Sequence, residues 1–257
     1  MITYVLAIVV GLVAASIITG GVFRMHDEWR WMKPKKVCIK CEQPKNVLDL
    51  LPVVGNLLTR FRCRKCKAYV QWQYPVIELV ILLLVVFHFW RYMNGIWVPA
   101  GYLDMVEIWL ARDIIFTLLL VIIFVYDLKY SLILDKYSLP GIVIALVLNM
   151  ILGVNGFVLA SGMLVLFLFF LAQYALSGGR ILGGGDVRMG VLMGAMLGFA
   201  GGIGAVLLSY MVGAVYGIIA IATGKSTLKD RVPFGTFLSI GAFIMLVWGS
   251  EILSLFL

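Results

Sequence analysis

Long apolar runs separated by short polar stretches dominate the pattern of this chain. Eight runs are candidates to cross a hydrocarbon layer of about 30 Å: residues 2–23, 75–92, 106–126, 138–153, 156–176, 187–200, 203–223 and 234–256. The sixth run is short and rich in glycine, so the sixth and seventh could form a hairpin or one long broken helix. The pattern predicts an all-α integral membrane protein with about eight transmembrane helices.

Composition agrees with this class. Hydrophobic residues make up 63% of the 257 positions and charged residues 13%, and the mean hydropathy is +1.05. A soluble globular protein would have too little polar surface with this composition. The first run has no basic segment before it and no convincing small-residue cleavage site, so we do not expect a cleaved signal peptide.

The basic residues predict the orientation. The stretch from Arg24 to Lys67 holds twelve of the 21 lysines and arginines, and seven more lie at 129, 136, 180, 188, 225, 229 and 231. Only Arg91 and Arg112 fall on the opposite side. The positive-inside rule therefore places the basic loops in the cytoplasm and both termini outside. The net charge of +8 is accounted for by topology and anionic lipid, and we expect no nucleic-acid partner.

A polar insert between the first two runs holds all four cysteines, in CIKC at 38–41 and CRKC at 63–66. Two CxxC knuckles separated by twenty-one residues are typical of a zinc ribbon with four thiolate ligands, Cys38, Cys41, Cys63 and Cys66. Disulfides are the alternative, but the insert is predicted on the reducing side of the membrane. A structural zinc that holds a small fragment together is the simplest interpretation. The predicted organisation is a first helix over 1–23, the insert over 24–73 and a polytopic membrane domain over 74–257.

Glu107 and Glu251 are predicted near the outer face, in contact with water. Four other carboxylates in or beside the apolar runs would be costly to bury unpaired, which indicates function. They are Glu78, Asp113, Asp127 and Asp186. Asp113 follows Arg112, which predicts a local ion pair. Glu78 could be a structural partner of a basic residue in the insert. Asp135 is expected in the loop or at the N-cap of the run that begins near 138.

Asp127 and Asp186 differ because both lie at the predicted cytoplasmic boundary, on different helices that can face each other. Two close carboxylates in a poorly solvated site share one proton, as peptide hydrolysis by an aspartate pair requires. Gly183, Gly184 and Gly185 permit unusual backbone angles and leave room for a substrate strand beside Asp186. A plain glycine turn with Asp186 as its N-cap is the structural alternative.

These residues together resemble the bacterial type IV prepilin peptidases, a family of GxGD aspartyl proteases. GGGD at 183–186 fits the GxGD signature, and YDLKYSLILD at 126–135 resembles the segment that carries the other aspartate. Further matches are the cysteine knuckles, YPVIE at 74–78 against YPxxE, and VPFGTFLSIG at 232–241 against PFGPFL. Departures include Thr19 for the asparagine of the first-span motif and Leu134 for the proline before Asp135.

The resemblance implies a membrane enzyme of the bacterial inner membrane with two activities. It would remove the basic leader of prepilins or pseudopilins at the cytoplasmic face and then methylate the new N-terminus from S-adenosylmethionine. Carried over by position, Asp127 and Asp186 would be the catalytic pair, the four cysteines would bind zinc, and Glu78 would be a candidate for methyl transfer. The departures concern the methyltransferase more than the peptidase.

Three alternatives remain at this point. Another GxGD intramembrane protease would be expected to show a PAL tripeptide near the C-terminus, and none is present. An ion-coupled transporter predicts charges near the middle of the membrane, whereas Asp127 and Asp186 fall at the ends of runs. A structural zinc-ribbon scaffold would tolerate the loss of both aspartates.

Overall fold

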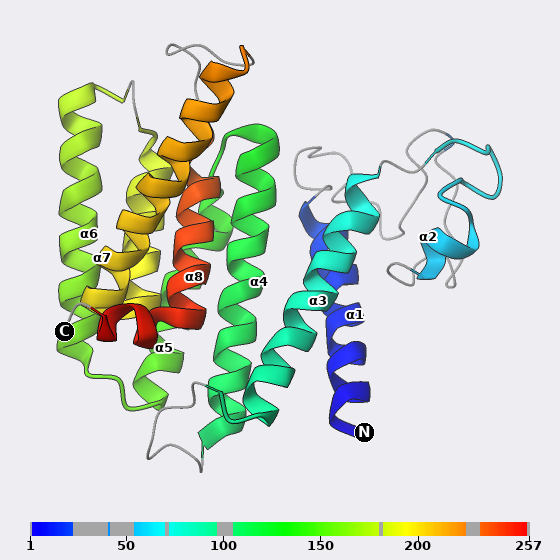
Figure 1. The fold of residues 1–257 in the computed structure, drawn as a ribbon, viewed down its shortest axis with the longest axis horizontal. Coiled ribbons are helices and arrows are strands. Elements are labelled where there is room, and N and C mark those ends of the chain that lie inside the picture. Colours follow the sequence, from blue (N-terminus) through cyan, green and yellow to red (C-terminus); the bar gives the residue numbers. More distant parts are fainter. Residues whose placement is uncertain are drawn as a thin grey trace. The chain divides into compact units, whose positions relative to one another are not determined.

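The computed structural model describes residues 2–22, 41, 54–69, 72–96, 105–179, 182–224 and 232–255. These residues form helices and connecting turns, with a single isolated β-bridge between Arg62 and Tyr69, which confirms the all-α class. The chain divides into two compact units, residues 1–96 and 97–257 (Figure 1). Each unit is described by itself.

The first unit is built on two apolar helices, α1 (Ile2–Val22) and α3 (Gln73–Met93), with the short α2 (Val54–Leu58) between them in sequence. The two long helices pack closely at Gly11, where a Cβ would lie 2.8 Å from Leu82 Cδ1. The Thr19 hydroxyl of α1 donates to the Ala15 carbonyl at 2.6 Å and lies 3.4 Å from the carboxylate of Glu78 on α3. Both side chains are buried, so Thr19 places a polar partner beside Glu78.

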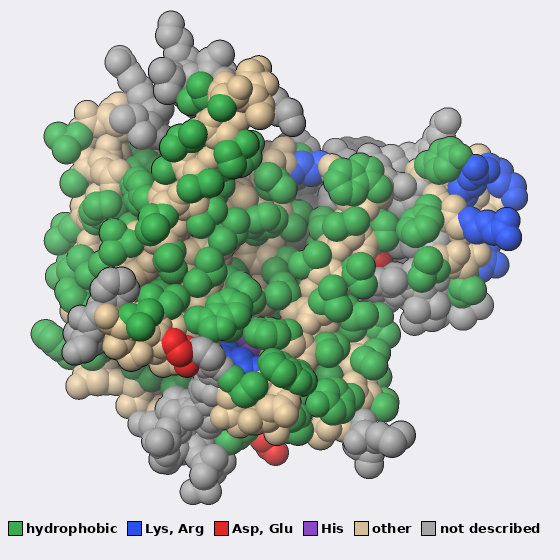
Figure 2. All heavy atoms as spheres, viewed as in Figure 1, with side chains coloured by type: hydrophobic (Ala, Val, Ile, Leu, Met, Phe, Trp, Pro, Cys, Tyr) green, Lys and Arg blue, Asp and Glu red, His purple; other side chains and the backbone are tan. Residues whose placement is uncertain are grey.

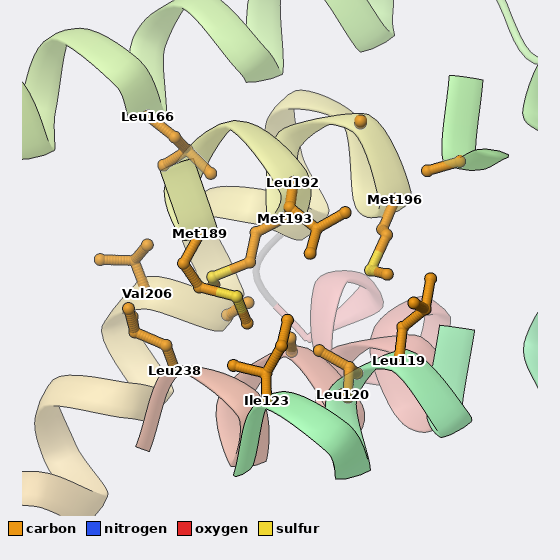
Figure 3. Close-up of a cluster of buried hydrophobic side chains, with 14 of the residues drawn as sticks. Leu119, Leu120, Ile123, Leu166, Met189, Leu192, Met193, Met196, Val206 and Leu238 are labelled. Carbon is orange, nitrogen blue, oxygen red and sulfur yellow. The ribbon is translucent and has the colours of Figure 1, made fainter. Parts of the chain in front are cut away.

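The second unit contains α4 (Val106–Tyr130), α5 (Asp135–Ile151), α6 (Gly156–Ser177), α7 (Gly184–Ala222) and α8 (Phe234–Ser254). Its core is a continuous cluster of branched and thioether side chains (Figure 3). The members labelled in the figure come from four helices: Leu119, Leu120 and Ile123 of α4, Leu166 of α6, Met189, Leu192, Met193, Met196 and Val206 of α7, and Leu238 of α8. Because α7 contributes to this cluster from both of its halves, it holds the other helices together.

The helix α7 is broken at Gly198, which has φ 69° and ψ −165°. A Cβ on Gly202 would lie 3.7 Å from the Cα of Gly194. In a straight helix, residues eight positions apart are about 12 Å apart, so the two halves of α7 fold back on each other. The sequence analysis left a hairpin and a long broken helix open, and the break at Gly198 has the geometry of a hairpin.

The polar side chain of Asn149 satisfies the backbone at this break. Its amide nitrogen donates to the carbonyls of Ala195 and Met196 at 2.8 and 3.1 Å. The break at Gly198 interrupts the helical hydrogen bonds that those carbonyls would otherwise accept four residues further on. Arg112 in turn donates to the side-chain amide oxygen Oδ1 of Asn149 at 3.3 Å. A buried polar chain from α4 through α5 therefore stabilises the reversal.

Five helices of the described chain are long and apolar enough to cross a membrane: α3, α4, α6, α7 and α8. Residues 3–19 of α1 form a shorter apolar helix. The space-filling view shows hydrophobic side chains over most of the visible surface, while lysines and arginines gather over the segment that follows α2 (Figure 2). The exposed basic residues there are Arg60, Arg62, Arg64, Lys65 and Lys67. The number of long apolar helices therefore confirms the prediction of a multi-pass membrane protein.

Candidate active site

Asp127 lies in the last turn of α4 and is only 4% exposed. Its Oδ2 accepts two hydrogen bonds from one residue in the first turn of α8, the backbone N–H of Thr236 at 2.8 Å and the Thr236 hydroxyl at 3.1 Å. Thr236 itself is buried. The N-terminus of α8 therefore fixes the carboxylate, because the unpaired N–H groups of a helix start favour an anion.

Gly235 is what lets α8 approach this carboxylate. A Cβ at position 235 would lie 3.0 Å from Asp127 Cγ and Oδ2 and 2.8 Å from Ile133 Cδ1. Contacts that short would force Asp127, Ile133 or the start of α8 to shift. Glycine at this position therefore allows the Thr236 N–H to reach Asp127.

Asp186 lies in the first turn of α7 and is 8% exposed. Its Oδ2 accepts the backbone N–H of Gly183 at 2.9 Å, while its own N–H donates to the Gly183 carbonyl at 3.1 Å. Gly183 is thus the N-cap, and Asp186 sits three residues further on as the reciprocal partner. The alternative that Asp186 itself is the N-cap is wrong, since its backbone is already helical.

The glycines before Asp186 do not use exceptional backbone angles. Gly183 has an extended φ of −83°, and none of the three has a positive φ. Gly185 instead permits a close approach, because a Cβ there would lie 2.9 Å from Ile133 Cβ. Around Gly183 and Gly184 the nearest atoms to an added Cβ are 3.7 and 3.8 Å away. The conformational reason for the glycines was therefore wrong. A Cβ at Gly183 or Gly184 would make ordinary van der Waals contacts, so packing does not require glycine at these two positions.

Ile133 links the two aspartate-bearing segments. It is buried and packs against both Gly185 of α7 and Gly235 of α8. Gly185 precedes Asp186, and the Cβ position of Gly235 lies 3.0 Å from Asp127 Cγ, so Ile133 joins the surroundings of the two carboxyl groups. The structure therefore brings together the two aspartates that the sequence singled out. We call Asp127 and Asp186 the aspartate pair.

Sequence reasoning did not assign roles to Thr236, Gly235 or Ile133. The segment 232–241 was matched only as a motif, and Ile133 reads as one apolar residue in a turn. A glycine followed by threonine at the start of an apolar run was the available signal, since small and hydroxyl residues at a helix start often meet a partner there.

The other acidic residues lie elsewhere. Asp113 is fully buried and paired with Arg112 at 2.6 Å, which confirms the predicted local ion pair. Asp135 is the first residue of α5 rather than its N-cap, which is Leu134, and it forms an exposed ion pair with Arg188 of α7. Glu78 belongs to the first unit.

Three of the four cysteines form a cluster in the first unit. The Sγ atoms of Cys41, Cys63 and Cys66 all lie within 4.8 Å of one another, and those of Cys41 and Cys63 are 3.9 Å apart. A disulfide would require about 2.05 Å, whereas four sulfurs at about 2.3 Å from a tetrahedral zinc lie about 3.8 Å from one another. Cys38 lies outside the described residues. The cluster thus has the spacing and chemistry of a metal site, although three ligands are seen.

The turn that carries Cys63 and Cys66 is set by the backbone. The N–H of Cys63 donates to the Ala68 carbonyl at 2.8 Å, and the N–H of Lys67 donates to the Cys63 carbonyl at 3.0 Å. Lys67 has a φ of 58°. The chain therefore reverses immediately after Cys66 and holds both thiols on one side of a tight loop.

Comparison with known proteins identifies the chain's relatives. Residues 9–92 match the bacterial peptidase A24 N-terminal domain, and residues 114–218 match the type IV leader peptidase family. The second match includes both aspartates of the pair. No solved structure matches the chain.

Curated relatives cover most of the sequence. A prepilin leader peptidase/N-methyltransferase of Aeromonas hydrophila is 30% identical over 86% of this chain and 74% of its own length. Proteins of the same name from Aeromonas salmonicida (strain A449) and Bacillus subtilis (strain 168) are 29% and 25% identical, over 88% and 87% of this chain and 75% and 86% of their own. The chain belongs to the type IV leader peptidase family.

Proposed function

We propose that this protein is a prepilin leader peptidase and N-methyltransferase in which the aspartate pair cleaves the leader. The observation that carries the proposal is the meeting of two buried aspartates. Asp127, at the end of α4, accepts hydrogen bonds from the start of α8, and Asp186, at the start of α7, accepts one from Gly183. Membership of the family supports the reaction, and the geometry supports these two residues for it.

The chemistry follows from two neighbouring carboxyl groups that share one proton. The ionised carboxylate takes a proton from a water molecule, whose oxygen attacks the scissile carbonyl carbon. The protonated carboxyl group donates its proton to the carbonyl oxygen. When the tetrahedral intermediate collapses, the carbon–nitrogen bond breaks, and the leaving amine takes the proton held by the first aspartate. A hydroxyl proton of the intermediate returns to the second aspartate as the new carboxyl group forms. The pair is then ready for another cycle.

The substrate would be a prepilin or pseudopilin with a basic leader followed by an apolar helix. The apolar helix would lie in the bilayer against the helices of the second unit. The lack of side chains at Gly183 and Gly184 supports a role for this loop as the place where the extended substrate strand passes Asp186. The basic leader would then remain in water at the cytoplasmic face.

The second activity would use S-adenosylmethionine, which supplies a methyl group to the new N-terminal amine. Glu78 is our candidate residue for this step or for holding the insert to the membrane. Its burial at 7% exposure, beside the Thr19 hydroxyl, supports a carboxylate with a defined environment. Thr19 stands where the family pattern has asparagine, and it still supplies a polar contact.

The proposed metal is a structural zinc bound by Cys38, Cys41, Cys63 and Cys66. The 3.9 Å separation of two thiol sulfurs supports it. For topology we propose eight spans in a bacterial inner membrane: α1, α3, α4, α5, α6, the two halves of α7, and α8. Both termini would lie outside, and the aspartate pair would lie at the cytoplasmic boundary.

Mass spectrometry of a prepilin-type substrate tests both activities. The purified protein, in detergent or lipid, is incubated with the substrate and S-adenosylmethionine. Loss of the leader, followed by a gain of one methyl group on the mature N-terminus, is the expected result. Metal-loaded, folded protein that leaves every prepilin-type substrate uncut would contradict the proposed function.

A further inference from the structure

The hydrogen bonds of the aspartate pair all go to one oxygen of each residue. Oδ2 of Asp127 accepts the N–H and the hydroxyl of Thr236, and Oδ2 of Asp186 accepts the N–H of Gly183. Within the part of the chain that the structure describes, neither Oδ1 atom accepts a hydrogen bond. Each carboxyl group therefore has one oxygen held by protein and one oxygen left for water and substrate.

The two aspartates are held differently. Gly183 lies three residues before Asp186, so its hydrogen bond is made within the start of one helix. Thr236 lies 109 residues after Asp127 and joins α8 to α4. The position of Asp127 relative to Asp186 thus depends on a tertiary contact at the start of α8, to which Thr236 contributes both its N–H and its hydroxyl group.

We propose that Thr236 is a positioning residue for the peptidase, which orients Asp127 so that Oδ1 exchanges protons with the attacking water. Two donors on one oxygen restrain rotation of the carboxyl group about its Cβ–Cγ bond. An oxygen that accepts two donors has its lone pairs occupied and is a poor acceptor for a third proton. Thr236 therefore determines which oxygen of Asp127 exchanges protons with the attacking water. This inference rests on the proposed function.

The two hydrogen bonds from Thr236 to Asp127 depend on a residue that differs from the family motif. The family segment PFGPFL has proline where this chain has Thr236 in PFGTFL. Proline has neither a backbone N–H nor a hydroxyl group, so it cannot make either bond. The environment makes both bonds effective here, because Thr236 and Asp127 are 5% and 4% exposed and a hydrogen bond to a buried carboxylate is stronger than one in water.

The test compares three substitutions at position 236 by steady-state cleavage of a prepilin-type substrate. Thr236→Val keeps the shape and the N–H and removes the hydroxyl, Thr236→Ala removes the hydroxyl with a smaller side chain, and Thr236→Ser keeps both donors. We expect kcat to fall by about tenfold to a hundredfold in the Val and Ala variants, with KM changed by less than about threefold, as for the loss of a charge-assisted bond. The Ser variant should retain most of the wild-type kcat.

Ser209→Ala is the matched control. Ser209 is fully buried, and its hydroxyl donates to the Ala205 carbonyl of its own helix at 2.6 Å. Its loss removes a buried hydroxyl without touching the aspartate pair, so kcat should stay close to wild type. Thermal unfolding of every variant in detergent separates a lost fold from a lost orientation.

The outcomes are distinct. A folded Thr236→Val protein with wild-type kcat, a change in KM alone, or a Ser variant as slow as the Val variant would overturn the role of Thr236 while leaving the peptidase intact. A wild-type protein that cleaves nothing in the same assay would overturn the proposed function itself, and this inference with it.

Discussion

At the residue scale, one buried carboxyl group forms an ion pair with a basic side chain, whereas those of the aspartate pair do not among the described residues. Asp113 is neutralised by Arg112 next to it in sequence, whereas the aspartate pair accepts hydrogen bonds only from backbone N–H groups and one hydroxyl group of the described residues. A buried carboxyl group without a counter-charge is costly. A catalytic role therefore best explains why two such carboxyl groups lie in one site.

Replacing either aspartate by asparagine should abolish leader cleavage. Asparagine keeps the shape but can neither take up nor deliver a proton, so Asp127→Asn and Asp186→Asn should each lower cleavage by at least about a thousandfold, as for loss of a member of a catalytic unit. Quantifying mature and precursor substrate by mass spectrometry measures this. Asp135→Asn is the control, because Asp135 is an exposed aspartate whose ion pair with Arg188 contributes little. Cleavage by either variant of the pair would remove that residue from the site.

Gly235→Ala should impair cleavage without unfolding the protein. The added methyl would lie 3.0 Å from Asp127 Cγ, so the carboxylate or the start of α8 must shift by a few tenths of an ångström. We expect kcat to fall by about tenfold or more, because small displacements of a reacting group are expensive. Steady-state kinetics of Gly217→Ala serve as the comparison. A Cβ on Gly217 meets nothing within 4 Å, so that variant should have wild-type kcat, and equal kinetics of the two variants would contradict the close approach at Gly235.

At the element scale, the spans were predictable, and the break in α7 was predicted between 200 and 203, a few residues after its position at Gly198. Apolar runs at 75–92, 106–126 and 156–176 became α3, α4 and α6 with ends within a few residues, because hydrocarbon thickness fixes helix length. The reversal falls at Gly198, although Gly194, Gly201 and Gly202 lie close by in the sequence. The choice depends on packing: a Cβ on Gly162 of α6 would lie 2.5 Å from the Gly198 carbonyl carbon. A contact between segments 36 residues apart leaves no local signal.

The site divides in the same way. Asp127 and Asp186 could be selected from the sequence because carboxylates are rare in apolar runs. Thr236 could not be assigned to Asp127 from the sequence, since the hydrogen bond joins residues 109 positions apart. The sequence analysis selected the glycines at 183–185 but explained them by unusual backbone angles. The structure explains Gly185 by its close packing against Ile133, since its φ is not positive.

Asn149 should be required for the stability of the α7 reversal. Its amide donates to two carbonyls that the break leaves without helical partners. Asn149→Ala should therefore lower the free energy of unfolding by about 1–3 kcal/mol, the cost of leaving buried acceptors unsatisfied. Thermal unfolding in detergent should show a clear fall in the transition midpoint. Asn94→Ala removes an exposed amide that donates to the Trp90 carbonyl at 2.7 Å, and it should change the midpoint little. Equal effects of the two substitutions would contradict a special role for Asn149.

At the scale of the whole molecule, the division into two units separates the proposed metal site from the aspartate pair. We expect the purified protein to hold about one zinc ion per chain, because four thiolates complete a tetrahedral site. Cys63→Ser and Cys66→Ser should each reduce the zinc content to near zero by elemental mass spectrometry. Lys65→Gln, between the two ligands, should keep the metal. Zinc content that does not depend on the cysteines, or thiols that resist alkylation until reduced, would favour the disulfide alternative.

The orientation of the membrane domain connects the position of the aspartate pair with its substrate. The hydrogen bond from the start of α8 to the end of α4, and the contacts of Ile133 with the starts of α7 and α8, place the pair at one end of the second unit. Lys129, Lys136 and Arg188 lie within a few residues of these helix ends in sequence, whereas Arg112 lies near the other end of α4. The positive-inside rule therefore predicts that the pair lies at the cytoplasmic face, where the proposed function needs the basic leader of the substrate to be.

The C-terminus should accordingly lie outside, since α8 starts at the aspartate pair and runs to Ser254 at its opposite end. Alkaline phosphatase, which is active only after export, should be active when fused after residue 257 and inactive when fused at Ser131. Green fluorescent protein fused at the same two positions should report the opposite pattern, because it fluoresces in the cytoplasm. The reverse result would place the pair on the outer face, where a leader retained in the cytoplasm could not reach it, and would exclude leader cleavage at this site.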